Sequence, residues 1–327
     1  MRKNLTLTDY LEGFKNQDRT ILARAITLVE SSLPEHQKLS SELLKTLLPQ
    51  TGGARRIGIS GTPGVGKSTF IEIFGKLLTA QNKKVAVLTV DPTSQVSGGS
   101  ILGDKTRMNE LAIDPNAFIR PTPSGDTLGG VAKKTRETLL LCEAFGFDDV
   151  LVETVGVGQS ETQVAQMTDI FIMLLQPGSG DDLQGIKRGI LELVDLVIVT
   201  KDDGDQAKMI ERAKHDYQKA LEILRHDSKV PPVLSSSSLT KKGFPEIEKY
   251  LENYFTKEKD LIIQKRNRQN IQWMWDLVHQ GLVESFREKI SVTEIQKMEE
   301  DILLLKRTPV EASDKLLSRF KMPISKN

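Results

Sequence analysis

Gly61-Thr-Pro-Gly-Val-Gly66-Lys67-Ser68 matches G-x-x-x-x-G-K-[ST], the pattern of a loop that wraps the phosphates of a nucleotide. The short apolar run Arg56–Ser60 precedes it, as a buried strand should, and residues 69–78 follow it with apolar side chains at helical spacing. Glycines let the N–H groups of the loop turn toward phosphate oxygens, and the start of the helix adds partial positive charge. The alternative is a chance glycine-rich turn, and the fitting strand and helix argue against it.

Two side chains of this loop have separate expected roles. We expect Lys67 to reach the β- and γ-phosphates and Ser68 to give its hydroxyl to Mg²⁺. The phosphate-binding set that the sequence predicts is Gly61, Pro63, Gly64, Val65, Gly66, Lys67, Ser68 and Thr69.

Composition excludes several classes of protein. With 38% hydrophobic and 27% charged residues the chain is typical of soluble globular proteins, and its net charge of +1 gives no global attraction to nucleic acid or membranes. No apolar run is long enough for a transmembrane helix, and the first residues lack the apolar core of a signal peptide. A single cysteine, Cys142, excludes an intrachain disulfide, and we expect a cytoplasmic protein. The four histidines are too scattered for a transition-metal site.

Hydrophobic patterns divide the 327 residues into three parts. Residues 1–52 carry two helical apolar stripes on either side of Pro34, and residues 53–256 alternate strand-like with helical runs. This alternation predicts an α/β fold with a doubly wound, mostly parallel sheet that binds ligands at the carboxyl ends of its strands. Residues 257–327 read as a helical dimerisation arm broken near Ser291 and Pro309. We expect Trp273 and Trp275 to pack into its core, with an interaction hot spot as the alternative.

The expected strands and helices of the central part have definite bounds. The strands are Arg56–Ser60, Val85–Val90, Phe118–Arg120, Val150–Glu153, Ile170–Leu175, Leu196–Thr200 and Val233–Ser235. The helices are Val131–Phe145, Ile186–Val194, Ala207–Leu224 and Pro245–Tyr254.

Acidic residues follow several of these strands. Asp91 ends the second strand and Asp104 follows a glycine-rich loop, where each can hold Mg²⁺ or position a water, although Asp91-Pro is also ordinary turn chemistry. Glu153 ends an apolar strand with Gly156 three residues on, like a D-x-x-G element that senses the γ-phosphate. Glutamate in place of aspartate is a departure from that pattern. The expected metal set is Ser68, Asp91, Asp104 and Glu153.

A base-reading motif follows the strand at 196–200. Thr200-Lys201-Asp202-Asp203 resembles N-K-x-D, with threonine in place of asparagine. We expect Asp203 to accept hydrogen bonds from N1–H and the 2-amino group of guanine, which adenine lacks. The stem of Lys201 covers the base, and the serines after the last strand, Ser237 and Ser238, add contacts. A solvated acidic turn is the alternative.

Taken together, the motifs resemble the methylmalonyl-CoA mutase-associated GTPases of the MeaB/ArgK family. The resemblance covers essentially the whole chain. It is carried by the phosphate loop 61–69, Asp91-Pro-Thr-Ser94, residues 98–108, Glu153-Thr-Val-Gly-Val-Gly-Gln-Ser-Glu161 and Gln184-Gly-Ile-Lys187.

The resemblance implies a homodimeric GTPase that binds GTP/GDP and Mg²⁺. It implies a chaperone for an adenosylcobalamin-dependent acyl-CoA mutase, gating the loading and release of that enzyme's cofactor, without implying that this chain binds cobalamin itself. Asp91, Asp104 and Glu153 then belong to the Mg²⁺ and switch regions, and residues 177–187 to a loop that meets the mutase. Because Lys67 is committed to the phosphates, we hypothesise that Lys187 supplies a second cation for hydrolysis; its alternative is a solvated helix face. Thr200 departs from the family's usual asparagine and puts base selectivity in question.

Three other functions stay open at this point. A metabolic kinase needs an acceptor pocket that no motif marks, and a metal-delivery GTPase needs a Cys/His cluster that one cysteine cannot form. An ATPase linked to basic amino-acid transport has no transporter-coupling feature in its favour.

Overall fold

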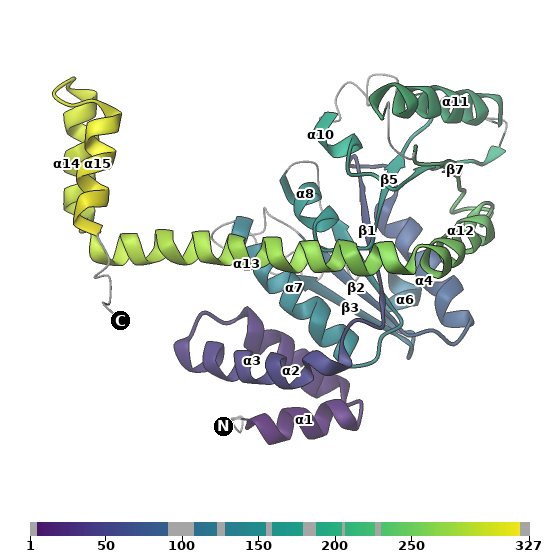
Figure 1. The fold of residues 1–327 in the computed structure, drawn as a ribbon. Helices are drawn as coiled ribbons and strands as arrows, with labels where there is room; N and C mark the ends of the chain where they lie inside the picture. Colours follow the sequence, from purple (N-terminus) through teal and green to yellow (C-terminus); the bar gives the residue numbers. More distant parts are fainter. Residues whose placement is uncertain are drawn as a thin grey trace. The chain divides into compact units, whose positions relative to one another are not determined.

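The computed structural model describes residues 5–90, 108–122, 128–154, 159–178, 188–204, 207–225 and 230–320. Within these residues, seven strands form one sheet in the order β3-β2-β4-β1-β5-β6-β7, and each neighbouring pair is parallel (Figure 1). The predicted α/β fold is confirmed, and the sheet is wholly parallel. The strands are β1 (Arg55–Gly61), β2 (Val85–Val90), β3 (Ala117–Thr122), β4 (Asp149–Thr154), β5 (Ile170–Leu175), β6 (Leu196–Val199) and β7 (Val233–Ser235).

Helices cover both faces of the sheet. Along β5, Ile170, Ile172 and Leu174 belong to one apolar core and Phe171 and Met173 to the other, because successive side chains of a strand point to opposite faces. The first core is completed by α4 (Lys67–Ala80), α6 (Asn109–Ala112) and α12 (Phe244–Lys257). The second is completed by α7 (Leu128–Ala144), α8 (Gln159–Ala165), α10 (Arg188–Leu191) and α11 (Ala207–Leu224). This two-sided cover is the doubly wound arrangement that the alternating pattern predicts.

The N-terminal segment contains one helix more than the two apolar stripes predict. Helices α2 (Arg19–Glu30) and α3 (Pro34–Leu47) correspond to the stripes, and α3 continues into a short 3₁₀ turn, η1 (Leu48–Gln50). The additional helix, α1 (Leu7–Lys15), begins with a capping box. The side chain of Thr6 accepts a hydrogen bond from the backbone N–H of Asp9, and the side chain of Asp9 accepts one from the backbone N–H of Thr6. Buried residues of all three helices join the core on the α7 side of the sheet.

A buried ion-pair cluster lies where the strands begin. Asp169, immediately before β5, is fully buried and accepts two hydrogen bonds of 2.6 Å from Arg266. The same guanidinium donates at 2.6 Å to the backbone carbonyls of Gly52 and Ala54, in the short segment between η1 and β1. The chain divides into two compact units after Arg266, so this residue is the last of the first unit. Its hydrogen bonds connect the residues just before β1 with the residue just before β5.

The second unit consists of residues from Asn267 onward. Helix α13 (Lys259–Lys289) runs into it and is followed by α14 (Val292–Leu303), which Ser291 caps, and α15 (Pro309–Phe320). The predicted breaks near Ser291 and Pro309 are confirmed. Trp275 is 51% exposed, so the expectation that it packs into a helical core is wrong within one chain. Exposed apolar side chains on a helix are typical of a surface that contacts another molecule.

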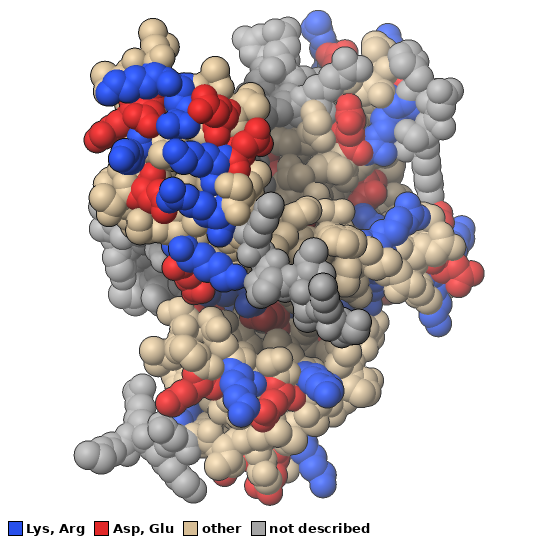
Figure 2. Space-filling view, turned by 60° about the vertical axis from the view of Figure 1, so that its left-hand side comes forward, with Lys and Arg blue, Asp and Glu red and all other residues tan. Residues whose placement is uncertain are grey.

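Charged side chains of both signs are mixed on the face of the molecule that Figure 2 shows. On the face drawn in Figure 2, the Lys and Arg side chains that the structure describes lie among Asp and Glu, without gathering into a field of one sign. This agrees with the nearly neutral net charge of the chain. Among the described helices, none is both long enough and apolar enough to cross a bilayer.

Candidate functional site

The loop between β1 and α4 is shaped to hold an anion. Gly64 and Gly66 have φ angles of +81° and +96°, which glycine adopts without strain, and a Cβ at either position would meet no atom within 4 Å. Gly66 also begins α4 without any side chain capping the helix. The loop therefore opens onto free space with the uncapped N–H groups of a helix beside it, and these features fit a phosphate chain.

Lys67 is held within this loop. Its Nζ donates to the carbonyl oxygens of Gly61 at 2.7 Å and Thr62 at 3.2 Å, and the residue is only 9% exposed. Gln176, just after β5, donates from Nε2 to the carbonyl oxygen of Gly64 at 2.8 Å. No motif in the sequence pointed to Gln176, although its place directly after a buried strand is the available signal. The ammonium group and the ordered loop together favour negative charge at this point.

Ser68 and Glu153 meet at the start of α4. The Ser68 hydroxyl donates to Oε1 of Glu153 at 3.1 Å, and Glu153, the last residue but one of β4, is 3% exposed. A hydroxyl and a carboxylate at the carboxyl edge of a parallel sheet are oxygen ligands of the kind that Mg²⁺ prefers, so the two residues fit such an ion. In the described part of the chain, no group of three or more His, Cys, Asp or Glu could hold a metal. Four predicted residues, Asp91, Asp104, Gly156 and Lys187, lie outside the described residues.

A buried network behind the phosphate loop was not anticipated from the sequence. Thr154 donates from Oγ1 to the Ser60 hydroxyl at 2.9 Å, and Ser60 donates to Oε1 of Glu161 at 3.0 Å. All three residues are at most 2% exposed. Ser60 directly precedes the loop, Thr154 directly follows Glu153, and Glu161 lies in the first turn of α8. The network thus joins the phosphate loop to both sides of the segment that contains Gly156.

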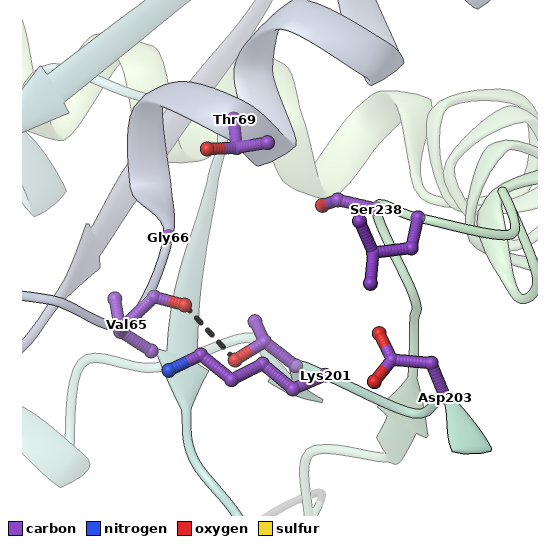
Figure 3. Close-up of a pocket in the computed structure, with 8 residues that line it drawn as sticks. Val65, Gly66, Thr69, Lys201, Asp203 and Ser238 are labelled. Carbon is purple, nitrogen blue, oxygen red and sulfur yellow. Dashed lines mark hydrogen bonds between the residues drawn. The ribbon is translucent and has the colours of Figure 1, made fainter.

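Beside the phosphate loop lies a cavity of about 290 Å³, the base pocket. In Figure 3 the Asp203 carboxylate points into it, with Ser238 on the same side and Val65 and Gly66 on the opposite side. Its lining residues are Val65, Gly66, Thr69, Thr200, Lys201, Asp203, Ser238 and Leu239. The phosphate loop and the base-reading motif, far apart in sequence, therefore share one cavity.

The two aspartates of the motif have different surroundings. Asp202 is buried and accepts hydrogen bonds from Ser235 Oγ at 2.8 Å and Lys242 Nζ at 2.9 Å. Burial alone raises the pKa of Asp202, but the hydrogen bonds from Lys242 and Ser235 and the Lys242 charge bring it below its usual value. Asp203 instead lines the base pocket and accepts at 3.0 Å from the hydroxyl of Ser237. Asp202 thus holds the loop together, and Asp203 is the aspartate that can meet a ligand.

The remaining residues of the motif shape the pocket. Lys201 has a φ of +63°, a left-handed backbone that is strained for lysine and that directs the chain sharply after β6. Ser237 is fully buried and its hydroxyl is turned to Asp203, so it orients the carboxylate, whereas Ser238 lines the pocket itself. The Thr200 hydroxyl lies 3.0 Å from the Val65 carbonyl oxygen and ties the base-reading loop to the phosphate loop.

Comparison with known proteins identifies the family. The model of the family described as "Methylmalonyl Co-A mutase-associated GTPase MeaB" matches residues 22–291. The chain belongs to this family. The resemblance seen in the motifs is therefore confirmed, and the protein is a GTPase.

Relatives of this MeaB-family GTPase come from bacteria and animals. The "Putative GTPase" of Caulobacter vibrioides is 50% identical over 93% of this chain and 94% of its own length. "GTPase ArgK" of Escherichia coli is 50% identical, with 84% of each chain covered, and the mouse "Methylmalonic aciduria type A homolog, mitochondrial" is 43% identical over 97% of this chain and 83% of its own. A solved structure titled "Crystal structure of LAO/AO transport system kinase" superposes with a TM-score of 0.78 at 38% identity, covering 97% of this chain and 98% of that one.

Proposed function

We propose that this GTPase is a nucleotide-dependent chaperone of an adenosylcobalamin-dependent acyl-CoA mutase of the methylmalonyl-CoA mutase type, and that it gates the loading and release of that enzyme's cofactor. The observation that carries the proposal is the family match over residues 22–291, whose description names that mutase. The mouse relative, named for methylmalonic aciduria, supports the same metabolic setting.

The contacts behind the phosphate loop support a switch. A protein that reports the state of its nucleotide needs a mechanical connection between the γ-phosphate and a segment that a partner can sense. Here Glu153 contacts Ser68, and the Ser60 hydroxyl joins Thr154 to Glu161. Thr154, just before residues 155–158, and Glu161, shortly after them, are thus both linked to the strand that leads into the phosphate loop. We infer that Gly156 in this segment responds to the γ-phosphate.

Individual residues then have definite tasks in binding and hydrolysis. Lys67 exchanges its loop carbonyls for the β- and γ-phosphates, and the N–H groups at the start of α4 hold the same oxygens. Ser68 and Glu153, together with Asp91 and Asp104, would hold Mg²⁺, which neutralises phosphate charge when it is bound. Asp203, oriented by Ser237, accepts the N1–H and 2-amino hydrogens of guanine.

Lys187 is our proposed second cation. GTP hydrolysis is slow unless a positive group stabilises the charge that develops on the transferring phosphate. We propose that binding of the mutase brings Lys187 to the site. Lys187→Ala should bind GTP and the mutase normally and keep slow basal hydrolysis, but should lose the stimulated rate. Full stimulation of GTP hydrolysis in this variant would show that Lys187 does not supply the second cation.

The experiment that tests the chaperone role is steady-state hydrolysis of GTP with and without purified methylmalonyl-CoA mutase. We expect slow turnover alone and a rise of at least tenfold with the mutase, in line with the contribution of about 10³-fold or more that a supplied cation can make. Lysozyme or another inert protein at the same concentration is the control. Unchanged turnover, together with no complex in size-exclusion chromatography, would contradict the proposal.

The solved relative titled as a transport system kinase provides a second candidate, an ATPase or kinase linked to basic amino-acid transport or small-molecule phosphorylation. ATP turnover exceeding GTP turnover, or phosphate transfer to a small acceptor, would favour it. The Asp203–Ser237 pair in the base pocket supports the guanine nucleotide instead, since adenine offers no N1–H to a carboxylate.

We also propose that the protein is a homodimer held by its C-terminal unit. Large apolar side chains there are exposed: Val292 at 69%, Val310 at 71% and Leu305 at 94%. A second copy of the same helices is the partner that would cover such a surface by symmetry. Light scattering should therefore give twice the chain mass. A chain ending after Arg266, which keeps the Asp169 ion pair, should be monomeric and still bind GDP; a monomeric full-length protein would contradict the proposal.

A further inference from the structure

The hydroxyl of Thr200 is committed to the protein backbone. Its Oγ1 lies 3.0 Å from the carbonyl oxygen of Val65 and 3.2 Å from that of Leu175, and the residue is 6% exposed. Both neighbours are acceptors, so the hydroxyl must act as the donor toward them. A threonine hydroxyl has one proton, and this proton is therefore already used in a hydrogen bond to the protein backbone.

Asparagine at the same position has a different capacity. Its amide carries two N–H donors, so it can give one to a backbone carbonyl and offer the other to a purine. The N7 atom of a purine is a hydrogen-bond acceptor and is satisfied only by a donor. Thr200 can tie the base-reading loop to Val65 as well as an amide does, but it has no second hydrogen for N7.

We propose that this GTPase reads guanine only through its N1–H and 2-amino edge and makes no hydrogen bond to N7. The proposal rests on the proposed role of Asp203. With that edge at Asp203, the imidazole part of the base faces the opposite side of the base pocket, where Figure 3 shows Val65, Gly66 and the ammonium end of the Lys201 side chain. Ser237 is already turned to Asp203, and Ser238 lies on the Asp203 side.

The consequence for selectivity is specific. Adenine and guanine both carry N7 as an acceptor, so a donor at position 200 adds affinity for purines without separating one from the other. Compared with asparagine, the threonine therefore lowers the affinity for purine nucleotides in general. The selectivity for GTP over ATP depends on Asp203. The departure from asparagine does not by itself make the pocket accept ATP.

The test compares GDP with 7-deaza-GDP, in which a C–H replaces N7, by calorimetric titration of the full-length protein. We expect the two dissociation constants of the wild type to agree within about twofold, because no hydrogen bond is lost. In Thr200→Asn, GDP should bind about fivefold more tightly than 7-deaza-GDP, the effect of one neutral hydrogen bond. Thr200→Val is the matched control: without its tie to Val65 it should weaken both nucleotides equally and leave their ratio at one.

A wild-type preference of fivefold or more for GDP over 7-deaza-GDP would overturn the proposal, whichever residue supplies the hydrogen bond to N7. This result can be obtained with the wild-type protein alone. Lys201→Met would then show whether the Lys201 ammonium is that donor. Titration with ADP tests the underlying assignment separately. ADP binding as tight as that of GDP would refute base reading by Asp203, while the ratio for 7-deaza-GDP would still decide whether N7 is read.

Discussion

Replacement of Arg266 by leucine should destabilise the sheet domain without impairing its nucleotide site. The guanidinium makes four hydrogen bonds of 2.6 Å, two to Asp169 and one each to the carbonyls of Gly52 and Ala54. Its side chain is 13% exposed and that of Asp169 is fully buried. Burial alone lowers the pKa of Arg266, but the hydrogen bonds and charge of Asp169 raise it above its usual value, so the pairing outweighs the burial.

The size of the effect follows from what is left behind. Removing one partner of a buried pair costs about 3–5 kcal/mol, because the other charge stays buried without compensation. Asp169 keeps a 2.8 Å hydrogen bond from the backbone N–H of Arg56, so we expect the lower end, about 3 kcal/mol. For a domain of this size that loss corresponds to a fall in melting temperature of about 6–12 °C.

The assay is thermal unfolding by circular dichroism, with GDP titration alongside. Arg268→Leu, two residues on and exposed, removes the same charge and should shift the melting temperature by less than about 2 °C. GDP affinity should be unchanged in both variants, since β5 alone separates Asp169 from the nucleotide edge by about 17 Å. Equal melting temperatures for the two variants would refute the reasoning, as would a loss of GDP binding in a folded Arg266→Leu protein.

Three further predictions concern other residues. Lys67→Ala should abolish GDP binding in calorimetry, because the ammonium that faces the phosphates is lost, while the nucleotide-free protein stays folded with a modest fall in melting temperature from the two lost hydrogen bonds to the Gly61 and Thr62 carbonyls; wild-type affinity would contradict the assignment of the loop. Burial raises the pKa of Glu137 to about 7, against the lowering effect of Lys133 and Lys134. Because the folded state then binds more protons than the unfolded state between roughly pH 4.5 and 7, stability should fall as pH rises through that window, by about 3 kcal/mol at most. Glu137→Gln should remove this dependence in denaturant titrations at pH 5 and pH 8, and an unaltered pH profile would show that the carboxyl is not responsible. Glu161→Leu should cost roughly 1.5–3 kcal/mol of stability by leaving the Ser60 hydroxyl without its charged acceptor, and Glu161→Gln, which keeps an acceptor, should cost less; equal losses in the two variants would argue against the hydrogen bond.

The sheet was predictable because its signal is local. Strands such as Val85–Val90 and Ile170–Leu175 are continuous apolar runs, as strands buried on both faces must be, and their bounds agree with the sequence prediction. Helix α8 was missed because its seven residues, Gln159–Ala165, are mostly polar, and the buried Glu161 accepts a hydrogen bond from Ser60, which lies far away in the sequence. A short polar stretch gives no periodicity from which a helix can be recognised.

The residues of the site could be predicted where they belong to a short sequence motif. Contacts between residues far apart in the sequence could not be predicted. The motif Thr200-Lys201-Asp202-Asp203 indicates a base-reading loop, but only Lys242 and Ser235 show that Asp202 is structural and Asp203 is left to line the pocket. Similarly, nothing near Arg266 in the sequence points to Asp169, 97 residues away. Such contacts depend on how strands and helices pack, which a single sequence does not encode in any short pattern.

The central claim, that one pocket binds the phosphates at the loop and selects guanine through Asp203, is tested most directly by Asp203→Asn. The amide can donate where the carboxylate accepted, so it suits the 2-oxo group of xanthine and opposes the 2-amino group of guanine. In steady-state hydrolysis by the full-length protein, we predict that the variant loses roughly 30- to 1000-fold in kcat/KM for GTP, the effect of two hydrogen bonds to a charged group, and gains hydrolysis of XTP over the wild type. A variant that still prefers GTP to XTP as strongly as the wild type would contradict the account.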